Sequence, residues 1–572
     1  MLRKLRFARP NPILLKRGTK GLDILRSPML NRGTAFTHGE RDQLGLRGLL
    51  PPVVKSLEQQ LSRARTMVDA VPHAVDKHAF MTDLQDRNEL LFFKLLCSDI
   101  ERFAPIVYTP TVGLATQNFS SIWRRPRGLF VSARDKGSIL QVLHNWREAD
   151  IAVIVVTDGS RVLGLGDLGI NGMQISIGKL ALYVAAGGIH PSHTLPIVID
   201  VGTNNPALLE HPDYLGLRQP RITQQEFDEL MDEFLWAVKT RWPHALVQFE
   251  DFSNNNAYPL LHRYRKMCRV FNDDVQGTGA VVTAGIYSSL RKMGKPLEAL
   301  KEQRIVCLGG GSAGLGVCFA ILNAMVSLGM SADEAAARFW IVDRDGLITA
   351  GRSKLLHGQE RFARPSHEAE GKSLLDTINA AQPTVLLGLS GVGGTFTEPM
   401  IRSMARFNES PIIFPLSNPT ANAECTAEQV HTWTDGRAIV AAGSPFDPVT
   451  VGGRVCLTSQ SNNMFIYPGV GMGTILCGAT RVSVSMFAVA ARALAENVDL
   501  TTGLVYPRVC TIRDVSARVA TAVIEEANRR GLATIKRPPQ FEDTLDWVRH
   551  SMWSPELSPI VSVGEDAVEQ NH

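Results

Sequence analysis

The chain has 572 residues and a formal net charge of +4, from 60 Lys and Arg residues against 56 Asp and Glu residues. This length predicts two to four domains, each with its own core. Because the charges nearly balance, the net charge gives no reason to expect binding to nucleic acid or to a membrane surface. No apolar run reaches the roughly 18 to 20 residues that a membrane-spanning helix needs, so we expect a soluble protein. The eight cysteines are scattered without a C-x-x-C pair, which indicates reduced, mostly buried thiols in an intracellular compartment.

The first twenty residues are the only compositionally biased segment. They carry seven Lys and Arg residues, and the first acidic residue is Asp23. A basic, acid-free N-terminus with apolar residues between the charges is typical of a mitochondrial transit peptide. Pro10, Pro12 and the shortage of serine fit a solvated basic arm instead. We therefore predict a targeting segment at residues 1–20 and a location in the mitochondrial matrix, with a cytoplasmic location as the alternative.

The chain from residue 21 to residue 273 changes from a helical to an α/β pattern. Helical spacing with charged faces runs from about residue 53 to 104 and predicts a helical N-terminal domain. Beyond Arg124–Gly128, apolar β-rich runs alternate with helices. Three of these runs end in an acidic residue, as strands do at the functional edge of an open α/β sheet. They cover residues 151–158, 194–200 and 245–251.

A second α/β series begins near Asp274 and predicts a doubly wound domain of roughly 190 residues. Helical patterns separate most of its expected strands. These strands lie around residues 304–308, 339–343, 384–389, 411–416 and 438–442. After Tyr506 the chain is helical again and ends in a segment that carries proline and acidic residues.

A glycine-rich turn, G-G-G-S-A-G, follows the apolar run at 304–308 and leads into a helical pattern. Spaced as Gly309-x-Gly311-x-x-Gly314, it is a dinucleotide fingerprint, in which glycines allow a tight turn and close approach of the backbone to pyrophosphate. Spaced as Gly310-x-Ser312-x-Gly314, it is a nucleophile elbow, and a serine hydrolase using Ser312 is the alternative of another class.

Residues elsewhere in the chain favour the dinucleotide interpretation of this turn. A hydrolase would need a histidine such as His431 or His550, and no H-G-G-G oxyanion segment lies upstream. A dinucleotide site needs an acid at the end of the next strand, and F-W-I-V-D supplies Asp343. This acid comes 29 residues after Gly314, against a usual spacing of roughly 20, which a longer helix and loop would explain.

Two acidic doublets stand at the ends of predicted elements. Glu250–Asp251 closes an apolar run, and Asp273–Asp274 precedes a helical stretch. Four carboxylates repel one another unless a cation or a shared proton compensates. Oxygen ligands favour Mg²⁺ or Mn²⁺ over zinc. The alternative is that the doublets cap helices or coat loops.

Three other side chains are candidates for chemistry. Lys179, at the start of an apolar helix, becomes a general base if burial or neighbouring cations lower its pKa; otherwise it is an ordinary solvated lysine. Tyr108 lies between Pro105 and Pro110, where a rigid backbone suits a proton donor, although packed tyrosines are commoner. Asn418 follows a predicted parallel strand, where ligands gather in such sheets.

Several longer motifs, in one order, closely resemble malic enzymes. They are V-Y-T-P-T-V-G, G-L-G-D-L-G-I-N-G-M, V-Q-F-E-D-F-S-N-N-N-A, F-N-D-D-V-Q-G-T, P-L-S-N-P-T-A-N-A-E-C-T and G-S-P-F. The resemblance runs from about Gly21 to Trp547. It implies oxidative decarboxylation of L-malate to pyruvate and CO₂ by a homodimer or homotetramer, with malate and pyruvate as its small-molecule ligands.

The implied fold class is α/β, with a Rossmann-type doubly wound dinucleotide domain inserted in a second α/β domain, behind a helical N-terminal domain. The expected N-terminal domain covers residues 21–126. The substrate and metal domain is discontinuous, at 127–273 and 464–535. The dinucleotide domain covers 274–463, and a tail covers 536–572.

The resemblance also implies roles for single residues. Lys179 matches the general base, Asp273 the neighbour that orients and charges it, and Tyr108 the acid that protonates the enolate. The expected ligands of a divalent cation, Mg²⁺ or Mn²⁺, are Glu250, Asp251 and Asp274. The expected substrate carboxylate contacts are Arg161, Asn418 and Asn462.

The expected cofactor is NADP, with NAD as the alternative. An acid such as Asp343 occurs with either cofactor in this family, whereas Arg344, Arg352 and Arg361 offer partners to a 2′-phosphate. The implied cofactor-binding residues are Gly309, Gly311, Ser312, Ala313, Gly314, Asp343, Arg344 and Asn418. The chain departs from the family where G-G-G-S-A-G stands for G-A-G-E-A-A and S-Q-S-N-N for G-Q-G-N-N. These changes put the details of cofactor contact and the place of Asn462 in question.

Arg63 and Arg87 match positions that bind fumarate in regulated relatives. They define an expected effector site, and the alternative is two ordinary arginines on helix surfaces.

Overall fold

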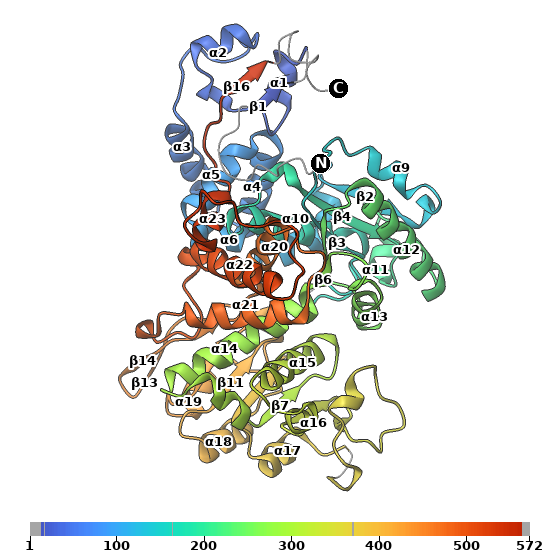
Figure 1. Cartoon of the computed structure of the whole chain (residues 1–572), viewed down its shortest axis with the longest axis vertical. Coiled ribbons are helices and arrows are strands. Elements are labelled where there is room, and N and C mark those ends of the chain that lie inside the picture. The colour runs from blue at the N-terminus through green and yellow to red at the C-terminus, as the bar shows by residue number, and fades with distance from the viewer. Residues whose placement is uncertain (1–12, 16–17, 163, 369–370, 563–572) are drawn as a thin grey trace.

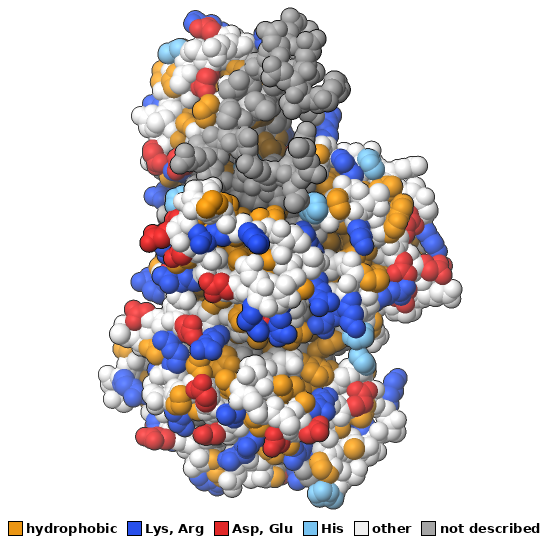
Figure 2. Space-filling view, in the orientation of Figure 1, with side chains coloured by type: hydrophobic (Ala, Val, Ile, Leu, Met, Phe, Trp, Pro, Cys, Tyr) orange, Lys and Arg blue, Asp and Glu red, His pale blue; other side chains and the backbone are white. Residues whose placement is uncertain are grey.

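The computed structural model describes residues 13–15, 18–162, 164–368 and 371–562. The N-terminal helices lie at one end of the long axis, the first sheet beside the middle and the second sheet at the other end (Figure 1). No helix in these ranges is both long and apolar enough to cross a membrane. Positive and negative side chains are interspersed over the face in Figure 2, in keeping with the small net charge.

Helices dominate the first hundred described residues. The longer ones have recognisable starts: α3 begins at a capping box, in which the Ser56 and Gln59 side chains each accept the other's backbone N–H. The helix α5 is buried on more than one face, since Phe92, Phe93 and Leu95 are all buried. The helices span Leu22–Arg26 (α1), His38–Gln43 (α2), Leu57–Ala70 (α3), Ala74–Arg87 (α4), Glu89–Ser98 (α5), Ile100–Val107 (α6), Thr111–Gln117 (α7) and Phe119–Ile122 (α8).

The first sheet is parallel throughout, with strand order β2-β4-β3-β5-β6. Every residue of its central strand β3 is buried, as expected for a strand covered by helices on both faces. Its strands are Leu129–Ser132 (β2), Val153–Thr157 (β3), Thr194–Asp200 (β4), Leu246–Phe249 (β5) and Val270–Asn272 (β6). Its helices are Ile139–His144 (α9), Met173–Ala185 (α10), Pro206–Glu210 (α11), Gln224–Arg241 (α12) and Asn254–Tyr264 (α13).

The second sheet has the order β15-β12-β11-β10-β7-β8-β9, parallel except for the pair β8–β9. From β7 the next strand, β8, is added on one side, whereas β10, β11 and β12 are added on the other. The carboxyl ends of β7 and β10 therefore form the switch point where doubly wound sheets bind ligands. The strands are Ile305–Leu308 (β7), Phe339–Asp343 (β8), Gly346–Leu347 (β9), Val385–Gly388 (β10), Ile412–Pro415 (β11), Ile439–Ala442 (β12) and Ser459–Gln460 (β15). A hairpin joins Val449–Val451 (β13) to Arg454–Cys456 (β14).

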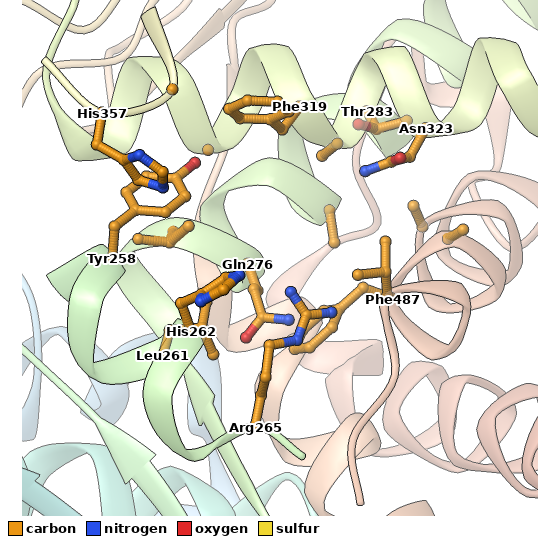
Figure 3. A pocket seen from close by; sticks show the side chains of 18 of the residues that line it. Tyr258, Leu261, His262, Arg265, Gln276, Thr283, Phe319, Asn323, His357 and Phe487 are labelled. Atoms are coloured by element: carbon orange, nitrogen blue, oxygen red, sulfur yellow. The ribbon is translucent and has the colours of Figure 1, made fainter. Parts of the chain in front are cut away.

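Helices accompany the second sheet and then return to the first. They span Thr278–Lys292 (α14), Ser312–Ser327 (α15), Ala332–Ala336 (α16), Leu374–Ala381 (α17), Glu398–Phe407 (α18), Ala427–Trp433 (α19), Tyr467–Leu476 (α20), Val484–Glu496 (α21), Ile512–Arg529 (α22) and Thr544–Ser551 (α23). α20 packs on α10 and α22, and α21 packs on α14. α13, α15 and α21 also meet around a cavity (Figure 3). The predicted fold class is confirmed: a doubly wound sheet lies between two chain segments that pack together.

The two ends of the described chain meet. Ile13–Leu15 (β1) pairs in parallel with Ile560–Ser562 (β16), and Leu15 is buried. Residues 1–12 and 16–17 of the expected targeting segment lie outside the described residues. All eight cysteines are free, and five of them are buried.

Candidate active site

Three carboxylates come together at the carboxyl edge of the first sheet. Glu250 and Asp251 follow β5, and Asp274 follows the neighbouring strand β6. One oxygen from each lies within 4.8 Å of the others, and Asp274 Oδ2 accepts the backbone N–H of Asp251 at 2.8 Å. The donor set consists of oxygens alone and is largely buried, which fits a hard divalent cation such as Mg²⁺ or Mn²⁺.

Two of these carboxylates have a raised pKa. Burial raises the pKa of Asp274 to about 6, and the charge of Asp273 adds to the rise. Burial also raises the pKa of Glu250 well above its usual value, although the Lys179 ammonium opposes the shift. A cation bound among the three groups would favour their ionised forms.

A short π-helix directs the side chains of Asp273 and Asp274 to different partners. It spans Asp273–Gly277, directly before α14. Asp274 contacts the backbone of Asp251, whereas Asp273 is fully buried and accepts a hydrogen bond from Lys179. Asn463 also donates to Asp273, at 3.1 Å. Single π-helical turns often occur at functional sites, because they re-aim neighbouring side chains.

Lys179 lies on α10 and is 1% exposed. Its Nζ donates to Asp273 Oδ2 and lies 2.9 Å from Glu250 Oε1. Burial lowers the pKa of Lys179, but the carboxylates of Asp273 and Glu250 outweigh it, so the net shift is well above the usual value. Of the two conditions considered for a lowered pKa, burial is met, but the neighbours of Lys179 are anions rather than cations.

Aromatic rings cover the lysine from two sides. Nζ of Lys179 lies 5.3 Å from the ring centroid of Tyr108, at the end of α6, and 4.6 Å from that of Tyr467, at the start of α20. Burial raises the pKa of Tyr108 above its usual value, against the opposing charge of Lys179, so its phenol stays protonated. Sequence reasoning did not identify Tyr467, whose only signal was its place before Pro468 at a helix start.

The expected substrate contacts line one cavity of about 390 Å³ together with Tyr108 and Lys179. Arg161 donates to Asn254 Oδ1, Asn418 Oδ1 accepts from Ser444 Oγ at 2.8 Å, and Asn462 donates to Thr109 Oγ1 at 3.3 Å. The same cavity is lined by Glu250, Asp251, Asp274, Ser312 and Ala313. It therefore opens both to the carboxylates of the first sheet and to the start of α15 in the second.

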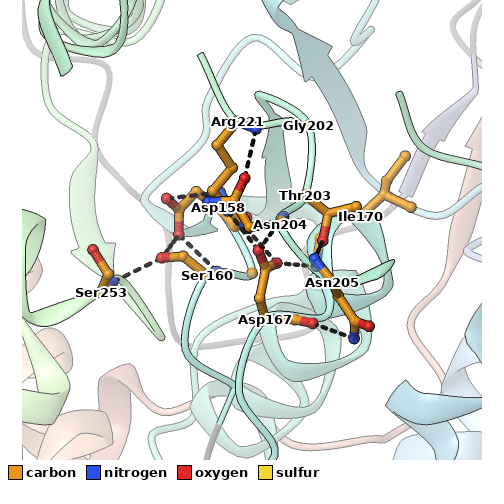
Figure 4. Close-up of polar contacts among 12 residues, drawn as sticks. Asp158, Ser160, Asp167, Ile170, Gly202, Thr203, Asn204, Asn205, Arg221 and Ser253 are labelled. Carbon is orange, nitrogen blue, oxygen red and sulfur yellow. Dashed lines mark hydrogen bonds and ion pairs between the residues drawn. The ribbon is translucent and has the colours of Figure 1, made fainter. Parts of the chain in front are cut away.

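The segment that carries Arg161 is held by a buried ionic network (Figure 4). Arg221 donates to Asp167 Oδ1 at 2.7 Å and Oδ2 at 2.9 Å, and lies 3.3 Å from Asp158 Oδ2. Ser160 donates to Asp158 at 2.6 Å and accepts the backbone N–H of Ser253 at 2.7 Å. The network fixes both sides of Arg161, and sequence reasoning did not identify it.

The glycine turn follows β7 at the switch point. Gly309 has φ 126°, and a Cβ there would lie 2.4 Å from the Leu389 carbonyl oxygen. A Cβ at Gly314 would lie 1.9 Å from the Gly309 carbonyl oxygen, so the turn must pack backbone to backbone. Gly311 precedes the first residue of α15. The turn thus presents a helix N-terminus to the cavity, which is the geometry that binds phosphates.

Ser312 is not arranged as a nucleophile. Its Oγ donates to Asn254 Oδ1, the same atom that accepts from Arg161. The histidines considered for a hydrolase bond elsewhere: His431 contacts Thr458 at 3.2 Å and His550 contacts Asp546 at 2.8 Å. The structure does not bring Ser312 to either of these histidines. Asn254, which bridges the two sheets, was not predicted, although it lies in the quoted S-N-N-N motif.

The residues expected to discriminate between NADP and NAD contact different partners. Asp343 ends β8 and accepts from Arg352 at 2.6 Å. Arg361 pairs with Asp333 at 2.9 Å. The side chain of Arg344 is 92% exposed and lies 3.5 Å from Asp345. Of the three arginines, Arg344 is therefore the most exposed to solvent.

The expected effector residues lie on helix surfaces. Arg63 is exposed on α3, and Arg87 on α4 pairs with Asp83 at 2.9 Å. Nothing in their geometry assigns them a ligand, so the effector site remains a prediction.

Comparisons with known proteins agree with this arrangement. Family models described as "Malic enzyme, N-terminal domain" and "Malic enzyme, NAD binding domain" match residues 85–265 and 275–528. The NADP-dependent malic enzyme of Dictyostelium discoideum is 46% identical over 91% of this chain and 96% of its own length. The mitochondrial NAD-dependent malic enzyme 1 of Arabidopsis thaliana is 44% identical over 95% of this chain and 92% of its own.

The fold recurs in a solved structure as well. Malic enzyme of Entamoeba histolytica superimposes with a TM-score of 0.54 at 22% identity, covering 89% of this chain and 91% of that one. With both family models matched in order and relatives aligned over nearly their whole length, this chain belongs to the malic enzyme family.

Proposed function

We propose that this chain oxidises L-malate with NADP and decarboxylates the product to pyruvate and CO₂. The observation that carries the proposal is the placement of Lys179 between Asp273 and Glu250, in a cavity bounded by three carboxylates and by the start of α15. Such a cavity combines a site for a divalent cation, a residue that can accept a proton and a helix N-terminus that can bind phosphate.

Glu250, Asp251 and Asp274 would hold the divalent cation. When bound, the cation would polarise the oxygen on C2 of the substrate and offset the negative charge that keeps Lys179 protonated. Arg161, Asn418 and Asn462 would hold the substrate carboxylates, because they line the cavity as a cation and two amides.

Proton transfer is assigned to Lys179 and Tyr108. Nζ of Lys179 accepts the C2 hydroxyl proton; a bound nicotinamide would supply the hydride acceptor for C2, and the product would be a 2-keto diacid. Loss of CO₂ leaves the electron pair on the enolate of pyruvate. Tyr108, kept protonated by burial, donates a proton to C3, and Lys179, stacked over the Tyr108 ring, returns one to the phenolate. Asp273 orients Lys179 and is a positioning residue.

The turn at Gly309, Gly311, Ser312, Ala313 and Gly314 would bind the dinucleotide phosphates. NADP is favoured over NAD because Arg352 already neutralises Asp343, which lowers the repulsion of a 2′-phosphate. Exposed Arg344, which follows Asp343 in the chain and lies 3.5 Å from Asp345, adds a second guanidinium for a 2′-phosphate. NAD remains the alternative, and relatives of both kinds exist.

The test is malate-dependent reduction of NADP and of NAD, each with and without Mn²⁺. We expect turnover only with the metal and a higher kcat/KM with NADP. Lys179→Ala should abolish turnover while dinucleotide affinity, measured by fluorescence titration, stays within about twofold, since the polar contacts of Lys179 are with Asp273 and Glu250 and not with the glycine turn. Substantial turnover by Lys179→Ala would remove this lysine from the proton acceptor's role.

We also propose a homo-oligomer in the mitochondrial matrix. The basic N-terminus supports the location, and family membership supports the assembly. Light scattering tests the assembly, and a fluorescent fusion with and without residues 1–20 tests the location; a monomer, or identical cytoplasmic fluorescence of the two fusions, would contradict these points.

A further inference from the structure

A second cavity, of about 320 Å³, lies between α13, α15 and α21. Its walls are mostly apolar, as in cavities that bind small organic molecules. Figure 3 shows the aromatic rings and polar tips of its lining side chains turned toward the space between these helices. The apolar walls include Leu261, Phe319, Ala320, Val484, Phe487 and Ala491.

This cavity is separate from the proposed active site. No residue that lines it also lines the cavity with Lys179. α14 forms a wall between them: Val281 and Val282 face the proposed active site, whereas Ala280 and Thr283 face the second cavity.

Two polar groups in the cavity lack partners. The Tyr258 hydroxyl is buried and has no hydrogen bond among the described residues. Arg265, on the cavity wall, is half-buried; burial lowers the pKa of its guanidinium, and nearby Arg481 lowers it further. No described carboxylate forms an ion pair with Arg265, although Glu360 also lines the cavity. A buried hydroxyl without a partner is costly, and a half-buried guanidinium without a counter-ion attracts an anion, so the two groups together favour a ligand that accepts hydrogen bonds and carries negative charge.

The cavity also touches two elements of the proposed active site. Val275 and Gln276 line it and directly follow Asp274, one of the three clustered carboxylates. Gly316 and Phe319 line it from α15, the helix that begins at Ser312. A Cβ on Gly316 would lie 2.6 Å from the Val275 carbonyl oxygen, so α15 and the π-helix are in direct contact here.

We propose that this cavity binds a small monocarboxylate with an apolar tail, and that this ligand regulates dinucleotide binding. The tail occupies the apolar space between α15 and α21, and the carboxylate accepts from Arg265 and the Tyr258 hydroxyl. The ligand contacts both the π-helix and α15, so its affinity depends on how these two elements are placed relative to each other. Differential contact of this kind is what couples two sites.

Calorimetric titration of the full chain with octanoate tests the site, with octan-1-ol as the uncharged comparison. We expect one octanoate bound per chain and at least about tenfold weaker binding of octanol, since the alcohol lacks the charge that Arg265 requires. Equal affinities for the two probes would overturn the assignment of a carboxylate ligand.

Two variants change the cavity and one matched variant does not. Arg265→Gln should weaken octanoate binding about tenfold or more, and Ala488→Leu should weaken it by filling the space. Lys266→Gln removes the same charge from an exposed neighbour outside the cavity lining and should leave affinity unchanged. Thermal melting of each variant confirms folding. Undiminished binding in both cavity variants, or equal loss in Lys266→Gln, would refute the site.

Coupling is tested by titrating NADP with and without saturating octanoate. We expect the NADP dissociation constant to change by about fivefold or more, and the octanoate constant to change by the same factor when NADP is present, as linkage requires. An NADP constant that octanoate leaves unchanged would refute regulation while the binding site itself stood.

Discussion

Replacing Arg221 with methionine should destabilise the protein far more than losing an ordinary surface arginine. Arg221 is 14% exposed and serves two acids, Asp167 at 17% and Asp158 at 1% exposure. Methionine keeps most of the volume and removes the charge, so the buried carboxylate of Asp158 and the partly buried carboxylate of Asp167 lose their cation. Breaking a buried pair in this way costs about 3 to 5 kcal/mol. The exposed pair of Arg402 with Glu398 on α18 is the control, and Arg402→Met should cost about 1 kcal/mol or less.

The loss should depend on pH in a definite direction. Burial alone would raise the pKa of Asp167, but Arg221 brings it below the usual value. A carboxyl with a lowered pKa stabilises the fold above its unfolded pKa, near 3.9, and that contribution is lost as pH falls through the folded value. Burial keeps the pKa of Asp158 raised even with Arg221 present. Protonation of these two carboxyls at acidic pH therefore removes unpaired charge from the variant, whereas in the parent Arg221 already compensates that charge. The difference in free energy of unfolding between parent and variant should be smaller at acidic pH.

Urea unfolding at pH 7.5 and pH 5 measures these effects. Fluorescence and circular dichroism should report the same transition, so that a free energy of unfolding is defined. Because the network flanks Arg161, kcat/KM for malate should also fall in Arg221→Met. A loss below about 1 kcal/mol at pH 7.5, or a gap that widens at pH 5, would refute the ionic account of this network.

Three further predictions follow from the proposed roles. Ser312→Ala should retain malate-dependent NADP reduction within about tenfold, since Ser312 contacts only Asn254 through its hydroxyl; complete loss would reopen a chemical role for the serine. Asp274→Asn should raise the Mn²⁺ concentration for half-maximal rate about tenfold or more, because it removes one of three charged ligands; an unchanged metal requirement would exclude Asp274 from the metal site. Arg344→Ser should lower kcat/KM for NADP about tenfold and leave that for NAD unchanged, and equal effects on the two cofactors would contradict the assignment of Arg344 to the 2′-phosphate.

The fold was predictable wherever local pattern and burial agree. Residues 339–343 were expected as a strand and form β8 with the same bounds. The apolar run at 384–389 contains β10, at Val385–Gly388. Fully buried parallel strands are continuous apolar runs between turns, so their positions follow from composition. The order of strands does not, because β9 turns back antiparallel beside β8 over only two residues.

The candidate site was predictable as a set of residues more than as a set of interactions. The resemblance implied roles in one reaction for Lys179, Asp273 and the three carboxylates, and the structure brings these residues close together. The supporting groups were missed because each acts across a long separation in sequence. Arg221 reaches Asp167 over 54 residues, and Ser312 reaches Asn254 over 58. No local spacing signals such a contact.

Lys179 shows why the direction of a pKa shift could not be predicted from residue type alone. A lysine within an apolar helix suggests desolvation, which lowers a pKa, and that part of the reasoning holds. The sign of the net shift is decided by Asp273 and Glu250, which arrive from two different strand ends and lie within hydrogen-bond reach of Nζ. The same two carboxylates keep the lysine in place and keep it protonated. A group that withdraws charge from Glu250 would therefore free Lys179 to accept a proton without moving it, which makes metal binding and proton transfer two consequences of one cluster.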